Sequence, residues 1–290
     1  MPKTRYRGRF APSPSGPLHL GSLLAATASY LDAKANHGEW FVRIEDIDPP
    51  REVPGASDLI LTTLLAHGLQ WDGEVVYQSA QSASYDAVLE TLWHREQLFY
   101  CTCTRADLQH YTTYPGTCRQ QKTPPSEPAA WRLRCGHGTQ IWQDGFQGSQ
   151  TWSMPTIGDT ILKRKDGLYA YQLAVVVDDH QQGITHVVRG IDLLDSTPRQ
   201  LYLFQQMQWQ APHYSHFPVI LDQHGYKLSK QNHAPAVDDA LAASNLLLCL
   251  GWLGQAQPTH LIHPKEILTY AIEHWQPSRL QGIHDIALTE

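Results

Sequence analysis

The chain lacks an excess of positive charge. Its 290 residues include 22 lysines and arginines against 28 aspartates and glutamates, which gives a formal net charge of −6, and the isoelectric point is about 6.2. Proteins that hold nucleic acid by non-specific electrostatics are usually basic. Any RNA contact is therefore expected to come from a local patch, and not from the overall field of the protein.

Long apolar segments are also missing, and cysteine is scarce. The longest apolar stretch, about residues 246–253, is interrupted by Gly251 and is too short to cross a bilayer, which takes about 20 residues. The first ten residues are basic without an apolar core, unlike a secretory signal. Five cysteines, three of them between residues 101 and 118, favour reduced thiols over a disulfide framework. We therefore expect a monomeric cytoplasmic protein without membrane contact.

The composition that remains is that of a globular protein, with 42% apolar and 17% charged residues. Residues 5–11 alternate and predict a strand. Prolines and glycines then dominate residues 12–21, which indicates a stiff loop whose backbone can approach a ligand closely. An apolar helical pattern runs from Ser22 to near Gly38. The N-terminus of a helix suits a phosphate, and we expect His19, two residues before it, to donate to phosphate oxygens.

The rest of the chain predicts a parallel sheet and an insertion. A strand at residues 40–44 follows the first helix, so strand, helix and strand form a βαβ unit. Residues 101–165 combine three cysteines, a proline-rich run and short β-like segments separated by glycines, which indicates an insertion with its own small core. Further elements are expected as helices at 54–67, 82–97, 196–209 and within 237–275, and as strands at 184–188 and 216–221.

Several sequence blocks together resemble class I aminoacyl-tRNA synthetases. The loop around His19 resembles their HIGH signature, and Lys227-Leu-Ser-Lys230 resembles their KMSKS loop. The glutamyl-tRNA synthetase branch is indicated by five blocks that appear in family order: Arg9-Phe-Ala-Pro-Ser-Pro-Ser-Gly16, Arg43-Ile-Glu-Asp46, Val176-Val-Asp-Asp-His180, Arg189-Gly190 and Thr197-Pro-Arg-Gln200.

The resemblance implies an α/β fold with a Rossmann-like, doubly wound parallel sheet. Residues 1–77 and 183–232 would form this catalytic part, residues 78–182 a zinc-containing α+β insertion, and residues 233–290 a short helical C-terminal region without an anticodon-binding domain. Only about sixty residues follow the lysine loop, which resembles the truncated paralogues of this branch. These attach glutamate to the queuosine base in the anticodon of tRNA(Asp). A short synthetase that charges a tRNA 3′ end, and a non-catalytic zinc protein that binds RNA, are the alternatives.

The implied first reaction is attack of the glutamate α-carboxylate on the α-phosphate of ATP, with Mg²⁺ accompanying the ATP. Preorganised donors that stabilise the developing charge carry most of such catalysis. The resemblance assigns catalysis to His19, Lys227 and Lys230, and ATP binding to His19, Gly21, Asp192, Ser229 and Lys230. Without the N-terminal motif, the two lysines would indicate only a solvated turn.

The chain departs from the family pattern at three positions near these motifs. Ser22 stands where the signature has its second histidine, Gln231 where arginine or serine is usual, and Ile191 where an acidic residue is usual. Asp178-Asp-His180 could be mistaken for a metal site. We interpret it as an exposed turn or a helix-ending cluster.

Glutamate carries two carboxylates and one ammonium, so its site needs cations and a carboxylate. The resemblance implies that Glu45 binds the amine, that Arg9 and Arg189 bind the carboxylates, and that Tyr171 contributes a hydroxyl. The alternative is that Arg43, Glu45 and Asp46 are merely charges that end a strand. The expected glutamate site comprises Arg9, Phe10, Ala11, Pro12, Ser13, Glu45, Tyr171 and Arg189.

Three cysteines form a candidate zinc site. Cys101 and Cys103 are two apart, and Cys118 follows after fourteen intervening residues. Zinc takes four ligands, and His110 would be the conventional fourth. The resemblance to the truncated paralogues instead places Tyr114 in this role, and we favour it. Chance clustering is the alternative. Cys135 and Cys249 are expected to be plain core or surface thiols.

Overall fold

A parallel sheet lies at the centre of the computed structural model, which describes residues 5–221 and 235–287. Its strands are β1 (Arg7–Phe10), β2 (Glu39–Ile44), β3 (Val76–Tyr77), β9 (His186–Gly190) and β10 (His213–Phe217). β1 pairs with β2, β2 with β3, and β9 with β10, all in parallel. The Thr185 N–H donates to the Arg7 carbonyl at 2.9 Å, so β1 lies beside β9. The strand order is therefore β3-β2-β1-β9-β10, and the predicted α/β fold with its parallel sheet is confirmed.

The first core joins this sheet to helices from both ends of the chain. Its helices are α1 (Leu20–Ala35), α2 (Ala56–Ala66), α8 (Ala242–Trp252) and α9 (Pro264–Glu273). α1 packs against β1 and β9 on one side and against α8 and α9 on the other. Residues 40–44 of β2 are all buried, as expected of a parallel strand covered on both faces. Trp40 and Leu23 are fully buried in this core.

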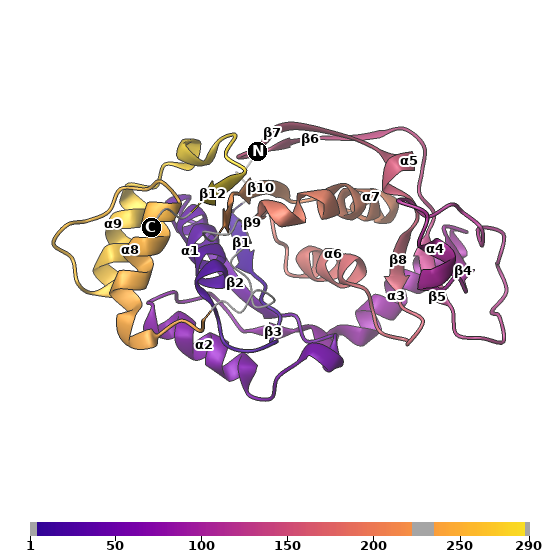
Figure 1. Ribbon diagram of the computed structural model, residues 1–290, viewed down its shortest axis with the longest axis horizontal. Coiled ribbons are helices and arrows are strands. Elements are labelled where there is room, and N and C mark those ends of the chain that lie inside the picture. Colours follow the sequence, from indigo (N-terminus) through magenta and orange to yellow (C-terminus); the bar gives the residue numbers. More distant parts are fainter. Residues whose placement is uncertain (1–4, 222–234, 288–290) are drawn as a thin grey trace.

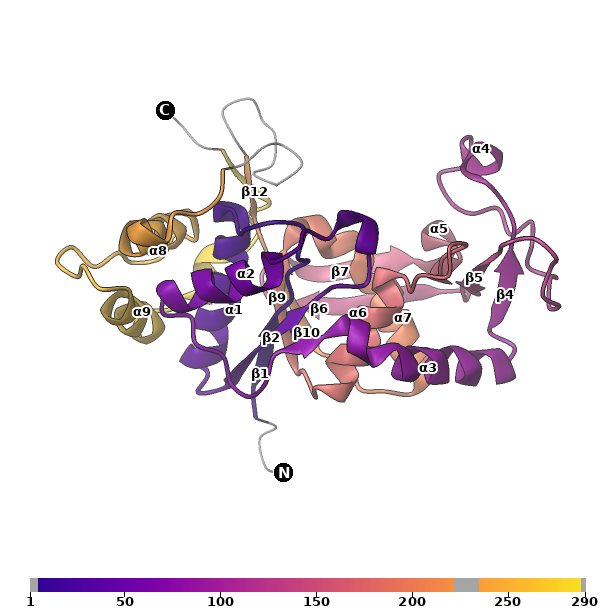
Figure 2. The ribbon, with the colours of Figure 1, turned by 90° about the horizontal axis from the view of Figure 1, so that it is seen from below.

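A second core lies toward the other end of the elongated molecule (Figures 1 and 2). Its elements are α3 (Ser82–His94), β4 (Leu98–Cys101), β5 (Ala130–Leu133), β8 (Thr160–Lys163), α6 (Tyr171–Gln181) and α7 (Thr197–Met207). β4, β5 and β8 form an antiparallel sheet, and Val175 to Val177 lie within α6. α6 and α7 share this core, although the predicted boundary at residue 183 assigns them to different parts of the chain. The domain boundaries stay a prediction.

A β-hairpin connects the two cores. It consists of β6 (Thr139–Asp144) and β7 (Gly148–Ser153), and it runs along α7 toward β10 (Figure 1). At its tip Phe146 is 3% exposed and belongs to the first core, while the Gly145 N–H donates to the Tyr214 carbonyl at 2.9 Å. A Cβ on Gly145 would lie 2.2 Å from Ser215 Oγ. A side chain at this position would therefore require the Ser215 hydroxyl to move.

The predicted helices are confirmed with small shifts at their ends, but two regions differ from expectation. The strand predicted at 216–221 is divided at Pro218 into β10 and β11 (Val219–Leu221), because proline has no N–H for the ladder. The C-terminal region is not only helical: β12 (Asp285–Ala287) pairs in parallel with β11. The short helices are α4 (Arg105–Leu108) and α5 (Met154–Ile157). None of the helices within the described ranges could cross a membrane.

Phe146→Ala should lower the free energy of unfolding by about 3–5 kcal/mol, because it empties a buried aromatic position that the hairpin tip contributes to the first core. Ile141→Ala on the same hairpin is the matched control. Ile141 is 68% exposed, so its truncation should change stability by no more than about 0.5 kcal/mol. Urea unfolding of both variants measures the difference. Equal, small effects would contradict the anchoring of the tip.

Candidate active site

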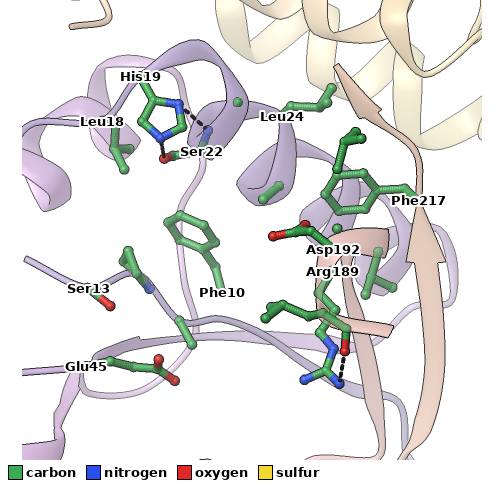
Figure 3. Close-up of a pocket in the computed structure, with 18 of the residues that line it drawn as sticks. Phe10, Ser13, Leu18, His19, Ser22, Leu24, Glu45, Arg189, Asp192 and Phe217 are labelled. Atoms are coloured by element: carbon green, nitrogen blue, oxygen red, sulfur yellow. Dashed lines mark hydrogen bonds between the residues drawn. The ribbon is translucent and has the colours of Figure 1, made fainter. Parts of the chain in front are cut away.

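A pocket of about 760 Å³ lies at the carboxyl ends of β1 and β9. The connections from these two adjacent strands leave in opposite directions along the sheet, and open α/β sheets bind ligands at such a switch point. Figure 3 shows His19 and Ser22 at one end of this pocket, Glu45 and Arg189 toward the other, and Phe10 between them. We call these the histidine end and the arginine end.

The pocket brings together the described residues that the resemblance assigned to glutamate and ATP. These are Arg9, Phe10, Ala11, Pro12, Ser13, His19, Gly21, Glu45, Tyr171, Arg189 and Asp192. They come from four separate segments of the chain. Lys227, Ser229, Lys230 and Gln231 lie outside the described residues, so their predicted roles stay predictions.

His19 lies at the start of α1. It is the N-cap itself, which corrects the expectation that it precedes the helix by two residues. Its Nδ1 accepts the Ser22 N–H at 3.2 Å, and its Nε2 lies 2.8 Å from Ser22 Oγ. Because Nδ1 is an acceptor, the ring proton belongs on Nε2, where it points to the serine hydroxyl. The residue that replaces the second histidine of the signature thus orients the first.

The chain on both sides of residues 222–234 borders the histidine end. On one side, Val219 and Ile220 line the pocket. On the other, Ala236 forms a β-bridge with His19, and the Val237 N–H donates to the Leu18 carbonyl at 2.8 Å. The described residues on either side of the lysine motif therefore reach the pocket or the N-terminal motif itself.

Gly190 admits Asp192 to the pocket wall. A Cβ on this glycine would lie 2.4 Å from Asp192 Oδ1, so only glycine allows the carboxylate this position. Asp192 lies in the first turn of the 3₁₀ helix Ile191–Ser196. Both residues line the pocket.

Buried ion pairs support the arginine end. Arg9 Nε and Nη2 donate to the two oxygens of Asp179 at 3.3 and 3.4 Å. Arg43 Nη1 donates to Asp179 Oδ1 at 2.8 Å and to Gln182 Oε1 at 2.7 Å. Burial alone would raise the pKa of Asp179, but Arg9 and Arg43 hold it below its usual range. Asp179 therefore stays ionised between the two guanidinium groups.

Two interpretations of charged residues are corrected by this arrangement. Arg43 is fully buried, so it is not a mere strand-ending charge. Asp178 and Asp179 lie near the end of α6 and are 1% and 2% exposed, so the helix-ending cluster is right for them and the exposed turn is wrong. Asp178 accepts hydrogen bonds from Gln78 and Tyr85.

Glu45 lies against Arg43, with Oε1 3.6 Å from Nη2. Burial raises the pKa of Glu45 more than Arg43 and Arg9 lower it, and the result is about 7. The charge of this carboxylate therefore changes near neutral pH.

The guanidinium of Arg189 is held by protein on every side. Its Nε donates to His216 Nε2 at 3.0 Å. Its Nη1 donates to Gln200 Oε1 at 2.9 Å and to Tyr171 Oη at 3.3 Å. Its Nη2 donates to Thr197 Oγ1 at 2.8 Å and to the Leu193 carbonyl at 3.2 Å. An arginine has five N–H donors, and each of these has a partner here.

A second cavity of about 320 Å³ adjoins the arginine end. It shares Glu45 and Tyr171 with the pocket and extends to Arg164 and Tyr169 beyond β8. Two acceptors on its lining residues, Glu52 Oε1 and Gln78 Oε1, are buried without a hydrogen-bond partner among the described residues.

Cys101 ends β4, and Cys103 lies between β4 and α4, which Figure 2 shows at the end of the molecule far from α8 and α9. The Sγ atoms of Cys101, Cys103 and Cys118 lie within 4.8 Å of one another. Tyr114 Oη lies 3.4 Å from Cys101 Sγ and 3.9 Å from Cys103 Sγ, and it accepts the Cys118 N–H at 2.9 Å. His110 is exposed and does not belong to this group. The geometry favours Tyr114 over His110 as the fourth member.

The remaining two cysteines lie apart from the cluster. Cys135 is partly buried, and Cys249 is buried in the first core. Both match the expectation of plain thiols.

Sequence reasoning missed the residues that hold the pocket arginines. Asp179, Thr197 and Gln200 lie in blocks that carried the resemblance, so the signal was present without an assigned role. Asp144 and His216 lie in no such block, and nothing in their local sequence marks them.

Comparison with known proteins places the chain in a family. The model of the catalytic domain of class I tRNA synthetases (E and Q) matches residues 5–245. A protein of Chromobacterium violaceum named glutamyl-Q tRNA(Asp) synthetase is 48% identical over 288 residues, which cover 97% of each chain. One of the same name from Idiomarina loihiensis is 49% identical over 274 residues, 93% of this chain and 96% of that protein.

Comparison with solved structures supports the same family. The crystal structure of a glutamate tRNA ligase from Elizabethkingia meningosepticum in complex with its amino acid has a TM-score of 0.82 and 26% identity. The match covers 99% of this chain and 67% of that one. The chain therefore belongs to the class I tRNA synthetases of the E and Q group.

Proposed function

We propose that this chain activates glutamate with ATP and transfers it to the queuosine base in the anticodon of tRNA(Asp). The single observation that carries the proposal is that one pocket gathers the described residues expected for glutamate and for ATP. The choice of acceptor is supported by relatives named glutamyl-Q tRNA(Asp) synthetase, which match this chain over 97% of both lengths in the case from Chromobacterium violaceum.

At the arginine end, Glu45 would bind the substrate ammonium. Arg9 would bind a carboxylate through Nη1, because its hydrogen bonds to Asp179 use Nε and Nη2 and leave Nη1 without a partner among the described residues. Arg189 has a partner for each donor, so a carboxylate must replace one of them. The bond to Tyr171 is the longest of the five at 3.3 Å, and a charged acceptor there would form a stronger bond than the neutral hydroxyl.

At the histidine end, the start of α1 and His19 would face the phosphates of ATP. The carboxylate oxygen attacks the α-phosphorus, and the bond to pyrophosphate breaks. Helix N–H groups and the imidazole N–H supply donors to the oxygens on which charge develops. Lys230 and Lys227 would complete this cradle, and Mg²⁺ would accompany the phosphates.

The second cavity suits the acceptor. Its lining includes the carboxylate residues Glu45, Asp48 and Glu52, and the queuosine side chain carries hydroxyl and amine groups that carboxylates can accept from. A hydroxyl entering beside Glu45 and Tyr171 would attack the acyl carbon of the adenylate, and AMP would leave. Because the two cavities share these residues, the acceptor would meet the activated end of glutamate.

We also propose one structural Zn²⁺, held by Cys101, Cys103, Tyr114 and Cys118. Three thiols within 4.8 Å of one another and a phenol 3.4 Å from one of them make a candidate four-member donor set. Thiolates are common zinc ligands, whereas a phenolate is an unusual one. The ion would tie β4 to the loop that carries Tyr114 and Cys118.

The proposed function is tested with labelled glutamate, ATP and three RNAs: tRNA(Asp) bearing queuosine, the same tRNA without it, and tRNA(Glu). Label is expected only on the first, and nuclease mapping should place it at the anticodon. Label at the 3′ end of tRNA(Glu) would assign the chain to acceptor-end charging. Absence of glutamate-dependent ATP–pyrophosphate exchange would favour a non-catalytic protein.

The KM for glutamate should depend on pH through Glu45. The pKa of Glu45 is raised to about 7, so the carboxylate is mostly protonated at pH 6 and mostly ionised at pH 8, whereas the substrate ammonium stays charged. The KM in pyrophosphate exchange should therefore fall by about tenfold over this range. Glu45→Gln should bind weakly and without this dependence, while Asp46→Asn should keep the wild-type profile. A flat wild-type profile would remove Glu45 from ammonium binding.

Cys101→Ser should release zinc and lower the melting temperature, because three ligands remain where four are needed. Cys135→Ser is the matched control, since its thiol donates to the Met154 carbonyl at 2.8 Å and does not belong to the cluster. Metal analysis of freshly purified protein measures both. Wild-type protein without zinc, or equal zinc in Cys101→Ser, would show that the clustering is incidental.

A further inference from the structure

A fully buried acid–imidazole pair lies directly behind Arg189. His216 Nδ1 lies 2.5 Å from Asp144 Oδ2, and both side chains are 0% exposed. The other carboxylate oxygen, Oδ1, accepts the backbone N–H groups of His216, Phe146 and Gln147 at 3.0, 3.1 and 3.0 Å. Burial would raise the pKa of Asp144, but the His216 hydrogen bond and the backbone donors hold it below its usual range. The carboxylate is therefore ionised and fixed in direction.

This pair determines which ring nitrogen of His216 carries the proton. An ionised carboxylate can only accept, so Nδ1 must be the donor toward Asp144. Nε2 is then left with a lone pair. Arg189 Nε donates to it at 3.0 Å, and the Thr197 hydroxyl oxygen lies 3.1 Å from it. Burial and the nearby Arg189 charge lower the pKa of His216, which keeps the ring neutral. Arginine has no acceptor, so the opposite tautomer would set two donors against each other.

Asp144 comes from a distant part of the fold. It lies at the tip of the β6–β7 hairpin, which belongs to the predicted insertion, whereas His216 lies on β10 and Arg189 on β9. Gln147 at the same tip donates to the His216 carbonyl at 2.7 Å. The tip is thus fastened to the strand that presents His216.

We infer that Asp144 and His216 are positioning residues for Arg189, and that the hairpin tip thereby sets the affinity of the pocket for the substrate carboxylate. The inference rests on the proposed function, in which Arg189 meets that carboxylate. Neither Asp144 nor His216 lines the pocket, so they act on it through the two groups that His216 Nε2 contacts, Arg189 and the Thr197 hydroxyl that Arg189 also binds.

The test is Asp144→Asn, measured by pyrophosphate exchange in the presence of queuosine-bearing tRNA(Asp). The amide of the new asparagine can donate to Nδ1 of His216, so the ring proton moves to Nε2. The Nε2–H group then faces the Nε–H donor of Arg189. The KM for glutamate should rise by about ten- to a hundredfold, while the KM for ATP changes little. An unchanged KM for glutamate would overturn the inference.

A double-mutant cycle with His216→Gln distinguishes positioning of Arg189 through His216 from a purely structural role of Asp144. A glutamine oxygen can accept from Arg189 without help from Asp144, so Asp144→Asn should raise the KM for glutamate by less than about threefold in that background. Equal effects in both backgrounds would contradict the inference. If Asp144→Asn does not fold, the KM for glutamate is compared between His216→Gln and His216→Leu. Only the leucine removes the acceptor for Arg189, so only this variant should show the raised KM. Equal KM values for that pair would contradict it too.

Asp159→Asn is the matched control. Asp159 is 5% exposed and accepts hydrogen bonds from Arg119 and from the Cys135 N–H at 2.7 to 2.8 Å, but it lies outside the pocket. Its substitution should lower the melting temperature and leave the KM for glutamate unchanged. Wild-type protein without glutamate-dependent exchange would contradict the proposed function. If the wild-type protein is active and Asp144→Asn has an unchanged KM for glutamate, only the positioning role is contradicted.

Discussion

Buried guanidinium groups impose the strictest constraint on this structure. Arg9, Arg43 and Arg189 are 4%, 0% and 4% exposed, and an ionised group that leaves water without compensation costs several kcal/mol. The Asp179 carboxylate on α6 compensates the charges of Arg9 and Arg43. Neutral acceptors on β10, α6 and α7 bind the guanidinium of Arg189. The carboxyl ends of β1, β2 and β9 are thus tied to elements of the second core, and the pocket floor is assembled from both cores.

The N-terminal half of the site could be predicted because its signals are local. Prolines and glycines between residues 12 and 21, an apolar helix after them and a buried strand at residues 40–44 specify a βαβ unit with a ligand loop at its switch point. The family blocks then pointed to Arg9, Glu45, Tyr171 and Arg189, and the structure gathers them around one cavity. Whether they bind glutamate and ATP stays a prediction.

The supporting residues could not be predicted, because their roles depend on tertiary contacts. Asp144 ends an ordinary strand of alternating polar residues, and its contact with His216 crosses 72 positions of sequence. From the sequence alone, Asp178 and Asp179 resemble an exposed polar cluster. Only the tertiary structure shows that they are buried and that Arg9 and Arg43 bind Asp179. β12 also escaped prediction, since three residues near the chain end carry too weak a pattern to indicate a strand that pairs with β11.

The contact between His19 and Ser22 bears on how the pocket is organised before any ligand binds. The imidazole is held at both nitrogens by one residue of the first helical turn, and its backbone is fixed as N-cap and by the bridge to Ala236. A side chain already confined to one rotamer loses little conformational entropy when a ligand arrives. The serine at position 22 thus makes the ring rigid in advance, so a ligand that accepts from the imidazole would exchange one hydrogen-bond partner for another without first having to order the side chain.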